Sequence, residues 1–308
     1  MSLAKAIGLK IASALLFALM QALVRWLGDA VPLGQVVFFR AAFAILPVII
    51  IFAWRRELLA AVMTNRPAGH LLRGLISVVG MFLNFAALAR LPLVDATAIS
   101  FAAPLITVAF AAWFLGERVR IYRWSAVTVG FVGVLVMLWP HFDLNRLIIA
   151  GSATTAVGAI CALGSAFTNA GAVIQTRILT KTETTSSIVF YFSLICAVGG
   201  LATLPLGWIV PSAAQLAALI ALGVLGGLAH ILLTESYRYA SASVVAPFDY
   251  TTMLWAFLLG YAIFGEVPTL YVLVGAVIVT GAGLFVLWRE RQLGLKRVRE
   301  AEGPPTAG

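Results

Sequence analysis

The chain has 308 residues, of which 62% are hydrophobic and only 11% charged, and its mean hydropathy is +1.03. Soluble globular proteins are about 45–50% apolar and about 25% charged, so the apolar surface of this chain must face lipid. The composition excludes a soluble enzyme, a disordered chain and a disulfide-stabilised secreted domain. It indicates an integral membrane protein.

Apolar runs follow one another along the chain, each near the roughly 20 residues that a helix needs to cross a bilayer. The first run is longer than a signal peptide and carries Arg25, so it predicts a retained membrane helix. No run shows the polar–apolar alternation of a barrel strand, so the predicted fold is all-α with ten transmembrane helices. The predicted spans lie near residues 7–28, 34–54, 70–90, 94–116, 122–139, 150–174, 186–207, 213–236, 243–264 and 269–288.

Lysine and arginine lie mainly in alternate loops. Membrane proteins retain these residues on the cytoplasmic side, and the pattern fits only if both termini are cytoplasmic. The net charge of +9 is therefore interpreted as a topology signal and not as a nucleic-acid site. The basic segment 291–308 is predicted to be a disordered cytoplasmic tail.

The two halves of the chain resemble each other weakly. A shift of 149 residues places Gly116 on Gly265 and Glu117 on Glu266. We therefore expect one five-helix repeat in residues 1–145 and a second in residues 146–290. Because five is odd, the second repeat must be inverted in the membrane, an arrangement characteristic of secondary transporters.

Several features resemble one family. They are Arg40 in the second span, Pro104 in the fourth, and the Phe-Leu-Gly-Glu-Arg ending of that span at Phe114–Arg118, which Phe264–Val267 partly repeats. Over nearly its whole length the chain resembles the drug/metabolite transporter superfamily in its ten-helix, EamA-type branch. Within that branch it is most similar to bacterial exporters of aromatic amino acids. Pro247 precedes the position that matches Pro104, so a bend in the ninth span could lie at a different depth.

The resemblance implies a bacterial inner-membrane exporter that works by alternating access from a central cavity. Its partners would be the lipid bilayer and a small amphipathic metabolite, with aromatic and other neutral amino acids favoured. It would use no ATP, and the sequence has no phosphate-binding loop. We expect no cofactor and no metal, and a monomer. A multidrug or other metabolite exporter is the alternative, and a membrane enzyme or channel is favoured less because no catalytic cluster or filter repeat is visible.

Polar side chains at membrane depth are costly and mark candidate sites. Asn84 and Gln21 could line a polar cavity wall or bond between helices. Asp249 could bind a substrate amino group, carry a coupled proton, or anchor a helix N-terminus. The shift of 149 maps Asp249 and Tyr250 onto Ser100 and Phe101, so both pairs could face one cavity.

The remaining candidates are aromatic or gating residues. Glu117 and Glu266 end their helices and are interpreted as structural residues rather than as binding residues. An aromatic-lined cavity would stack a planar ligand, although packing against lipid or other helices is equally consistent for any one ring. Predicted substrate-binding residues are Gln21, Phe82, Asn84, Ser100, Phe101, Phe167, Asp249, Tyr250 and Trp255. Predicted proton or gating residues are Arg40, His230, Pro104 and Pro247.

Overall fold

A computed structural model describes residues 3–54, 63–116, 120–142, 152–239 and 246–302. All regular secondary structure in these segments is helical, which confirms the all-α part of the predicted fold. The α-helices are α1 (Leu3–Leu27), α2 (Leu33–Trp54), α4 (Pro67–Arg90), α5 (Leu93–Ser100), α6 (Ala102–Leu115), α7 (Ile121–Leu138), α9 (Ser152–Leu179), α10 (Thr185–Leu201), α11 (Ala213–Tyr239), α13 (Thr251–Phe264) and α14 (Leu270–Glu302). Short 3-10 helices are η1 (Gly28–Ala30), η2 (Trp139–Phe142), η3 (Leu204–Leu206) and η4 (Ala246–Tyr250).

Within the described segments, seven helical stretches are long and apolar enough to cross a membrane. Shorter apolar helical stretches coincide with the second, ninth and tenth predicted spans, at Leu33–Leu46, Phe248–Phe264 and Leu270–Val286. Many large apolar side chains on these helices are exposed. The chain is therefore a multi-pass membrane protein.

The fourth and ninth predicted spans are both interrupted. α5 ends at Ser100 and α6 begins at Ala102, whereas α13 follows the 3-10 helix η4. Pro104 lies in the first turn of α6, where a missing backbone N–H is tolerated. The 149-residue shift superposes the bounds of α6 and α13, and both helices end at a left-handed glycine, Gly116 (φ 63°) and Gly265 (φ 64°). The two interruptions thus lie at equivalent positions, not at different depths.

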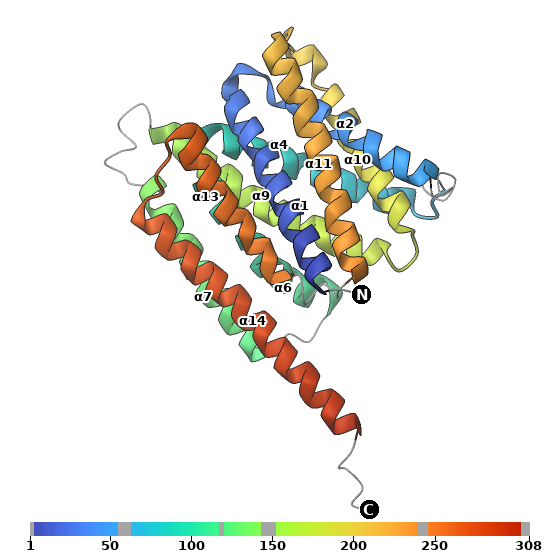
Figure 1. Cartoon of the computed structure of the whole chain (residues 1–308), viewed down its shortest axis with the longest axis vertical. Coiled ribbons are helices and arrows are strands. Elements are labelled where there is room, and N and C mark those ends of the chain that lie inside the picture. The colour runs from blue at the N-terminus through green and yellow to red at the C-terminus, as the bar shows by residue number, and fades with distance from the viewer. Residues whose placement is uncertain (1–2, 55–62, 117–119, 143–151, 240–245, 303–308) are drawn as a thin grey trace, which may run out of the picture.

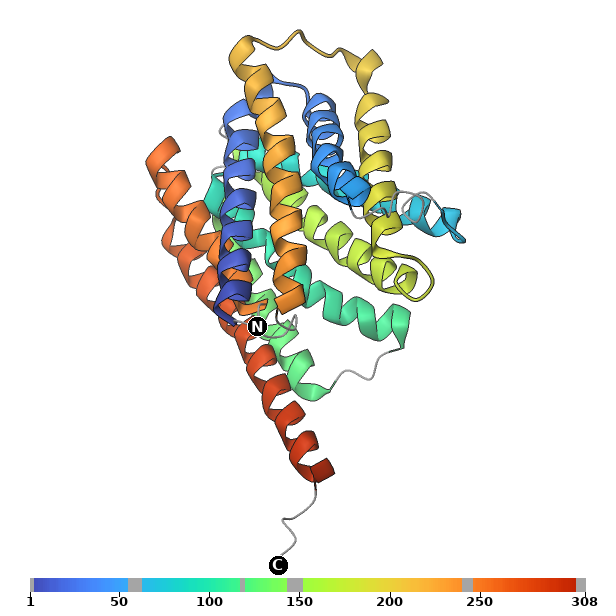
Figure 2. The same ribbon diagram turned by 45° about the vertical axis from the view of Figure 1, so that its right-hand side comes forward.

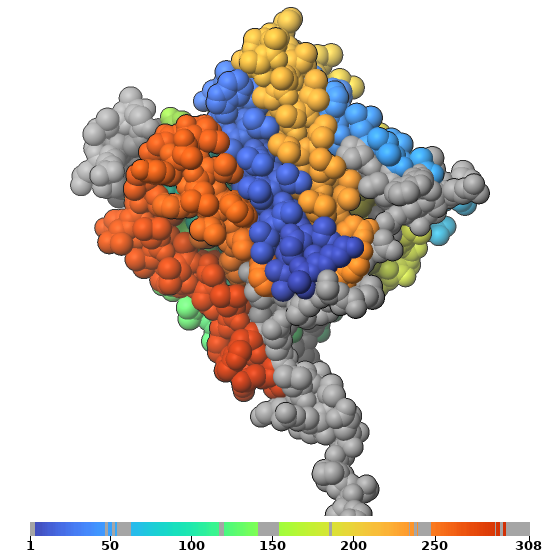
Figure 3. Space-filling view, viewed as in Figure 1, coloured from blue at the N-terminus to red at the C-terminus, as the bar shows by residue number. Residues whose placement is uncertain are grey.

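Helix pairing follows the same correspondence. α1 packs along α11 as α4 packs along α9, and α13 lies on α1 as α6 lies on α9. α7 and α14 lie side by side, and α2 packs on α10 (Figures 1 and 2). Glycines allow the α7–α14 approach, because a Cβ at Gly275 would overlap the carbonyl oxygen of Gly133. In the space-filling view α1 lies between α11 and the α13–α14 pair (Figure 3).

The last helix continues beyond its predicted span. α14 extends to Glu302 and projects away from the bundle, whereas the sequence predicted disorder from residue 291 (Figure 1). Segment 289–302 is rich in Arg, Glu, Lys and Leu, which favour helix, and it extends a helix that packing has already formed. Residues 303–308 lie outside the described segments.

Candidate functional site

The two interruptions meet through their aromatic residues. Phe101, between α5 and α6, stacks on Tyr250, between η4 and α13, with ring centroids 5.0 Å apart and planes inclined by 26°. Both rings are partly buried. The Tyr250 hydroxyl lies against the backbone of Gly283 in α14, where a Cβ would overlap it. The structure thus brings together two candidates that the sequence shift had paired.

Polar candidates lie along the α1–α5 contact. The Thr97 hydroxyl is 3.1 Å from Gln21 Oε1 and 2.7 Å from the carbonyl oxygen of Leu93. The Ser100 hydroxyl donates to the carbonyl oxygen of Thr97 at 2.6 Å, within its own helix. Gln21 therefore makes the interhelical hydrogen bond that was one of its two predicted roles.

Asp249 forms an ion pair that the sequence did not predict. Its Oδ1 lies 2.5 Å from Nζ of Lys10. The Lys10 side chain is 3% exposed and that of Asp249 is 51% exposed, so the lysine rather than the carboxylate is the buried partner. Lys10 lies within α1, which begins seven residues earlier, at Leu3.

The other aromatic and amide candidates lie farther apart. Phe82 and Asn84 are half-buried on α4, and Phe82 packs against the main apolar core. Trp255 is half-buried on α13, and its buried Nε1 has no hydrogen-bond partner among the described residues. Phe167 is 43% exposed and contacts Phe110 of α6.

The four predicted proton or gating residues form one direct pair. Arg40 is 6% exposed, and its Nη2 donates to Nε2 of His230 at 3.2 Å. Phe17 of α1 packs edge-on against the His230 ring at 5.0 Å. Pro104 is exposed, and Pro247 lies in η4. Arg40 is thus buried between helices.

Glu266 joins three helices. Its Oε1 accepts from Nε of Arg25, at the end of α1, and its Oε2 accepts from the backbone N–H of Leu93, at the start of α5, at 3.0 and 2.7 Å. Arg25 also donates to the carbonyl oxygen of Ala89 at 2.9 Å. We call this set the Glu266 junction. It agrees with the structural role predicted for Glu266; Glu117 lies outside the described residues.

A second buried pair was missed because its members are 113 residues apart. His70 Nε2 donates to Glu183 Oε2 at 3.3 Å, and both side chains are at most 2% exposed. Glu183, in the loop between α9 and α10, also accepts from the backbone N–H of Asn65 at 3.0 Å. Burial raises the pKa of Glu183, but hydrogen bonds from His70, Asn65 and Thr64 outweigh it and hold the pKa below its ordinary value of 4.5.

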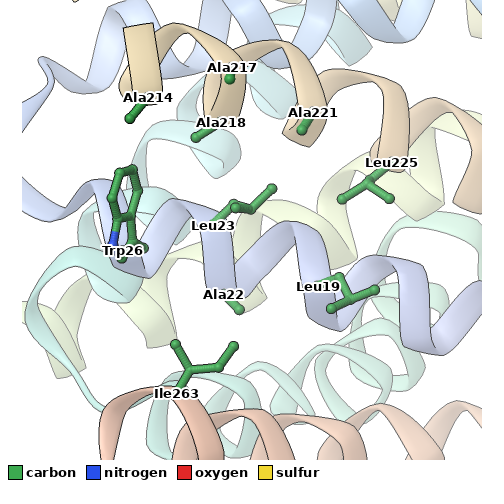
Figure 4. Close-up of a pocket in the computed structure, with 10 residues that line it drawn as sticks. All are labelled: Leu19, Ala22, Leu23, Trp26, Ala214, Ala217, Ala218, Ala221, Leu225 and Ile263. Carbon is green, nitrogen blue, oxygen red and sulfur yellow. The ribbon is translucent and has the colours of Figure 1, made fainter. Parts of the chain in front are cut away.

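An apolar groove of about 580 Å³ opens between α1, α11 and α13 (Figure 4). α1 lines it with Leu19, Leu23 and Trp26, and α11 with a row of alanines that includes Ala214 and Ala218. None of the predicted substrate-binding residues lines this groove. Apart from the indole of Trp26, the side chains that line the groove are aliphatic, and this composition suits lipid chains.

The arrangement is suited to binding rather than to covalent chemistry. Where side chains are described, no three His, Cys, Asp or Glu residues gather as metal ligands. The groups present are stacked rings, amides, guanidinium groups and ion pairs. Such groups can hold an amphipathic solute and can be rearranged without making or breaking covalent bonds.

Comparison with known proteins places the fold among transporters. Residues 4–139 and 156–288 each match the EamA-like transporter family. The chain is 31% identical to an S-adenosylmethionine uptake transporter of Rickettsia bellii, over 89% of this chain and 90% of that protein. It is 31% identical to a riboflavin transporter of Rhizobium johnstonii (89% and 88% covered) and 30% identical to a pseudopaline exporter of Pseudomonas aeruginosa (86% and 90%). A solved crystal structure superposes with a TM-score of 0.63 at 18% identity, covering 95% of this chain and 99% of the other.

Proposed function

The chain belongs to the EamA-like transporter family, and from that premise we propose that it exports small amphipathic metabolites by alternating access between two inverted five-helix halves. Residues 1–145 and 146–290 form the halves of this proposal. Three findings support it. Each half of the chain matches the family separately, and α6 and α13 have equivalent bounds. Each of the most extensively packed helix pairs also has a counterpart made of the equivalent helices of the other half. An inverted repeat gives two access states of similar structure, which alternating access requires.

The proposed substrates carry a flat aromatic ring together with polar groups, and aromatic and other neutral amino acids are the first choice. The observation that carries this choice is the Phe101–Tyr250 stack, because rings at the meeting point of two broken spans can separate to admit a planar group. The S-adenosylmethionine and riboflavin transporters act on compounds with fused aromatic rings, which extends the class beyond amino acids. A multidrug or other metabolite exporter remains the alternative.

The proposed location is a bacterial inner membrane with both termini cytoplasmic. In this orientation the Glu266 junction lies at the outer side, and the Lys10–Asp249 pair lies nearer the cytoplasm. We propose that the cavity is lined by Gln21, Phe82, Asn84, Ser100, Phe101, Phe167, Asp249, Tyr250 and Trp255.

Counterflow in proteoliposomes tests the function. Liposomes loaded with L-phenylalanine, S-adenosylmethionine or riboflavin should accumulate the labelled solute saturably in at least one case, and repeating the assay with a pH gradient reports proton coupling. Asn84→Ala and Asp249→Asn should lower the flux about tenfold, the effect of losing one hydrogen bond to a charged group.

Asp29→Asn is the matched control, because the Asp29 side chain is 69% exposed and its distance to Arg90 is 3.8 Å. It should leave flux unchanged. Absence of saturable flux for every solute would contradict the proposed function. Normal flux in both Asn84→Ala and Asp249→Asn would contradict the cavity assignment alone.

A further inference from the structure

Two arginines of the helix bundle, Arg40 and Arg73, pair with no carboxylate of the described residues. Arg40 of α2 is 6% exposed and bonds to His230. Arg73 of α4 is partly buried; its Nε donates to Thr176 Oγ1 at 2.8 Å and its guanidinium lies 4.5 Å from the centre of the Phe192 ring. Arg73 Nη1 is buried and has no hydrogen-bond partner in the described part of the chain. Neither arginine belongs to an ion pair formed by the described residues.

Both guanidinium groups act on the same interior region. Arg73 lies over the ring of Phe192, which is one turn of α10 from the buried Cys196. Cys196 and Phe192 belong to one apolar cluster with Ala41, the residue after Arg40, and Arg40 bonds to His230 of α11. α2 packs on α10 and α11, and α4 packs on α10 and α2. We call Arg40, Arg73, Cys196 and His230 the arginine cluster.

The cluster carries two positive charges in a setting that disfavours them. A charge at membrane depth is costly unless it is paired, and the ordinary solution is a carboxylate on a neighbouring helix. Among the side chains that the structure describes, no carboxylate forms an ion pair with either guanidinium. The buried Nη1 of Arg73 is a donor that points to a missing acceptor.

The cluster lies next to a predicted binding residue. Phe17, which contacts His230, and Gln21, which contacts Thr97, are four residues apart in α1 and therefore on one face, one turn apart. The residue of α1 that packs on His230 is thus one helical turn from Gln21. Guanidinium groups match carboxylates in particular, because their planar donors can bond both oxygens.

We propose that Arg40 and Arg73 bind the carboxylate of the transported solute, so that this transporter selects aromatic carboxylic acids, amino acids included, over their uncharged analogues. The inference rests on the proposed function and specifies its substrate class. It gives Arg40 a role in binding in addition to the gating role considered from sequence.

Matched acid and amide probes test the selection. The full chain is purified in detergent, and its thermal stabilisation is titrated with L-phenylalanine against L-phenylalaninamide and with benzoate against benzamide. The wild type should bind each acid at least about tenfold more tightly than the amide, the effect of one charge-assisted hydrogen bond. Arg40→Gln and Arg73→Gln should each reduce that preference to within about twofold.

Arg90→Gln is the control, since Arg90 is also on α4 but bonds to the carbonyl oxygen of Ala86 near the helix end; it should keep the full preference. Should the glutamine variants fail to fold, Arg40→Lys and Arg73→Lys keep the charge without the planar donor pair. They should still prefer the acid, with about tenfold weaker binding than the wild type.

Several outcomes would overturn the inference. These are equal binding of acid and amide, no binding of either acid, an unchanged preference in both glutamine variants, unchanged acid affinity in both lysine variants, or equal stabilisation by chloride alone. Because the assay measures binding, it is independent of counterflow. Solute flux without acid preference would refute the carboxylate site alone, whereas acid binding without flux of any solute would refute the proposed function alone.

Discussion

The position of the Tyr250 side chain depends on Gly283, a residue of α14 that has no side chain. Its hydroxyl occupies the space that a Cβ at Gly283 would need, while its ring lies on Phe101. The position of the ring is therefore determined from both sides. At this scale the sequence placed Phe101 and Tyr250 at matching positions under the shift of 149, and the structure shows that their rings are in contact. Nothing in the sequence indicated Gly283, because contact between different helices leaves no local pattern.

Gly283→Ala should destabilise the protein, because the added Cβ overlaps the Tyr250 hydroxyl and forces the ring off Phe101. Gly281→Ala is the matched control: nothing lies within 4 Å of its Cβ position, and alanine in a helix is favoured over glycine by about 1 kcal/mol. Thermal melting in detergent should show a lower midpoint for Gly283→Ala only. Adding Tyr250→Phe to Gly283→Ala should restore part of the loss; no restoration would mean that the hydroxyl is not the obstacle.

Glu183 should contribute stability in a pH-dependent way. Because its pKa in the folded protein is below the ordinary 4.5, its contribution is present above that value and is lost as the pH falls through the folded-state pKa. Glu183→Gln should therefore melt below the wild type at about pH 7, and the difference should shrink once the pH falls below 4.5. A difference that stays constant across this range would show that the carboxylate charge is not the stabilising feature.

At the scale of helices, the Glu266 junction connects the ends of α1 and α13 with the start of α5. The Arg25 and Glu266 side chains are 24% and 12% exposed, so water screens their pair only in part. The backbone N–H of Leu93 lies at a helix start, where no partner within the helix is available. One carboxylate thus satisfies groups on two neighbouring elements.

Glu266→Gln should lower the free energy of unfolding by about 1–3 kcal/mol, because Arg25 loses its charge partner while the amide can still accept from Leu93. Arg25→Gln should cost a similar amount, and the double variant should cost less than the sum. The Arg90–Asp29 pair provides the control: at 3.8 Å and largely exposed, it should change stability by less than about 0.5 kcal/mol in Asp29→Asn. Additive losses for Arg25 and Glu266 would contradict the junction.

Hydropathy located the helices because the requirement to cross about 30 Å of lipid acts locally on each run. α2 and α7, for example, begin and end within a residue of the predicted spans. The interruption at Phe101 was missed because both of its flanks are apolar. The pairs Lys10–Asp249, Arg25–Glu266 and His70–Glu183 could not be predicted, because each joins residues more than 100 positions apart and a charged residue does not specify its partner.

At the scale of the whole molecule, the most extensive packing of the helices is symmetric. When each helix of such a packed pair is replaced by the equivalent helix of the other half, the result is again a packed pair. α1–α11 corresponds to α4–α9, α2–α11 to α10–α4, and α2–α10 and α7–α14 each correspond to themselves. If the halves are inverted, equivalent loops face opposite sides of the membrane. The loops between α2 and α4 and between α10 and α11 are such a pair.

Single cysteines in these two loops test the inversion. Met63 and Leu206 are 73% and 84% exposed, and of the native cysteines Cys196 is buried and Cys161 half-buried, so background labelling should be low. In intact cells a membrane-impermeant maleimide should label Leu206→Cys but not Met63→Cys, and lysis should expose both. Labelling of both or of neither before lysis would contradict an inverted repeat, and labelling of Met63→Cys alone would place the termini outside.

The two ion pairs of α1 together restrict how the molecule can move. Lys10 and Arg25 are about 22 Å apart along the helix axis, and their partners, Asp249 and Glu266, stand at the two ends of the η4–α13 segment. A helix that is bonded to its neighbour at one point can rotate about that point. Bonds near both ends fix the angle between the two helices. While both bonds hold, α1 and α13 must therefore move together as one rigid unit. Any opening of the bundle then occurs at the surfaces of this unit, where α1 slides past α11 or α13 leaves α5, and not between α1 and α13.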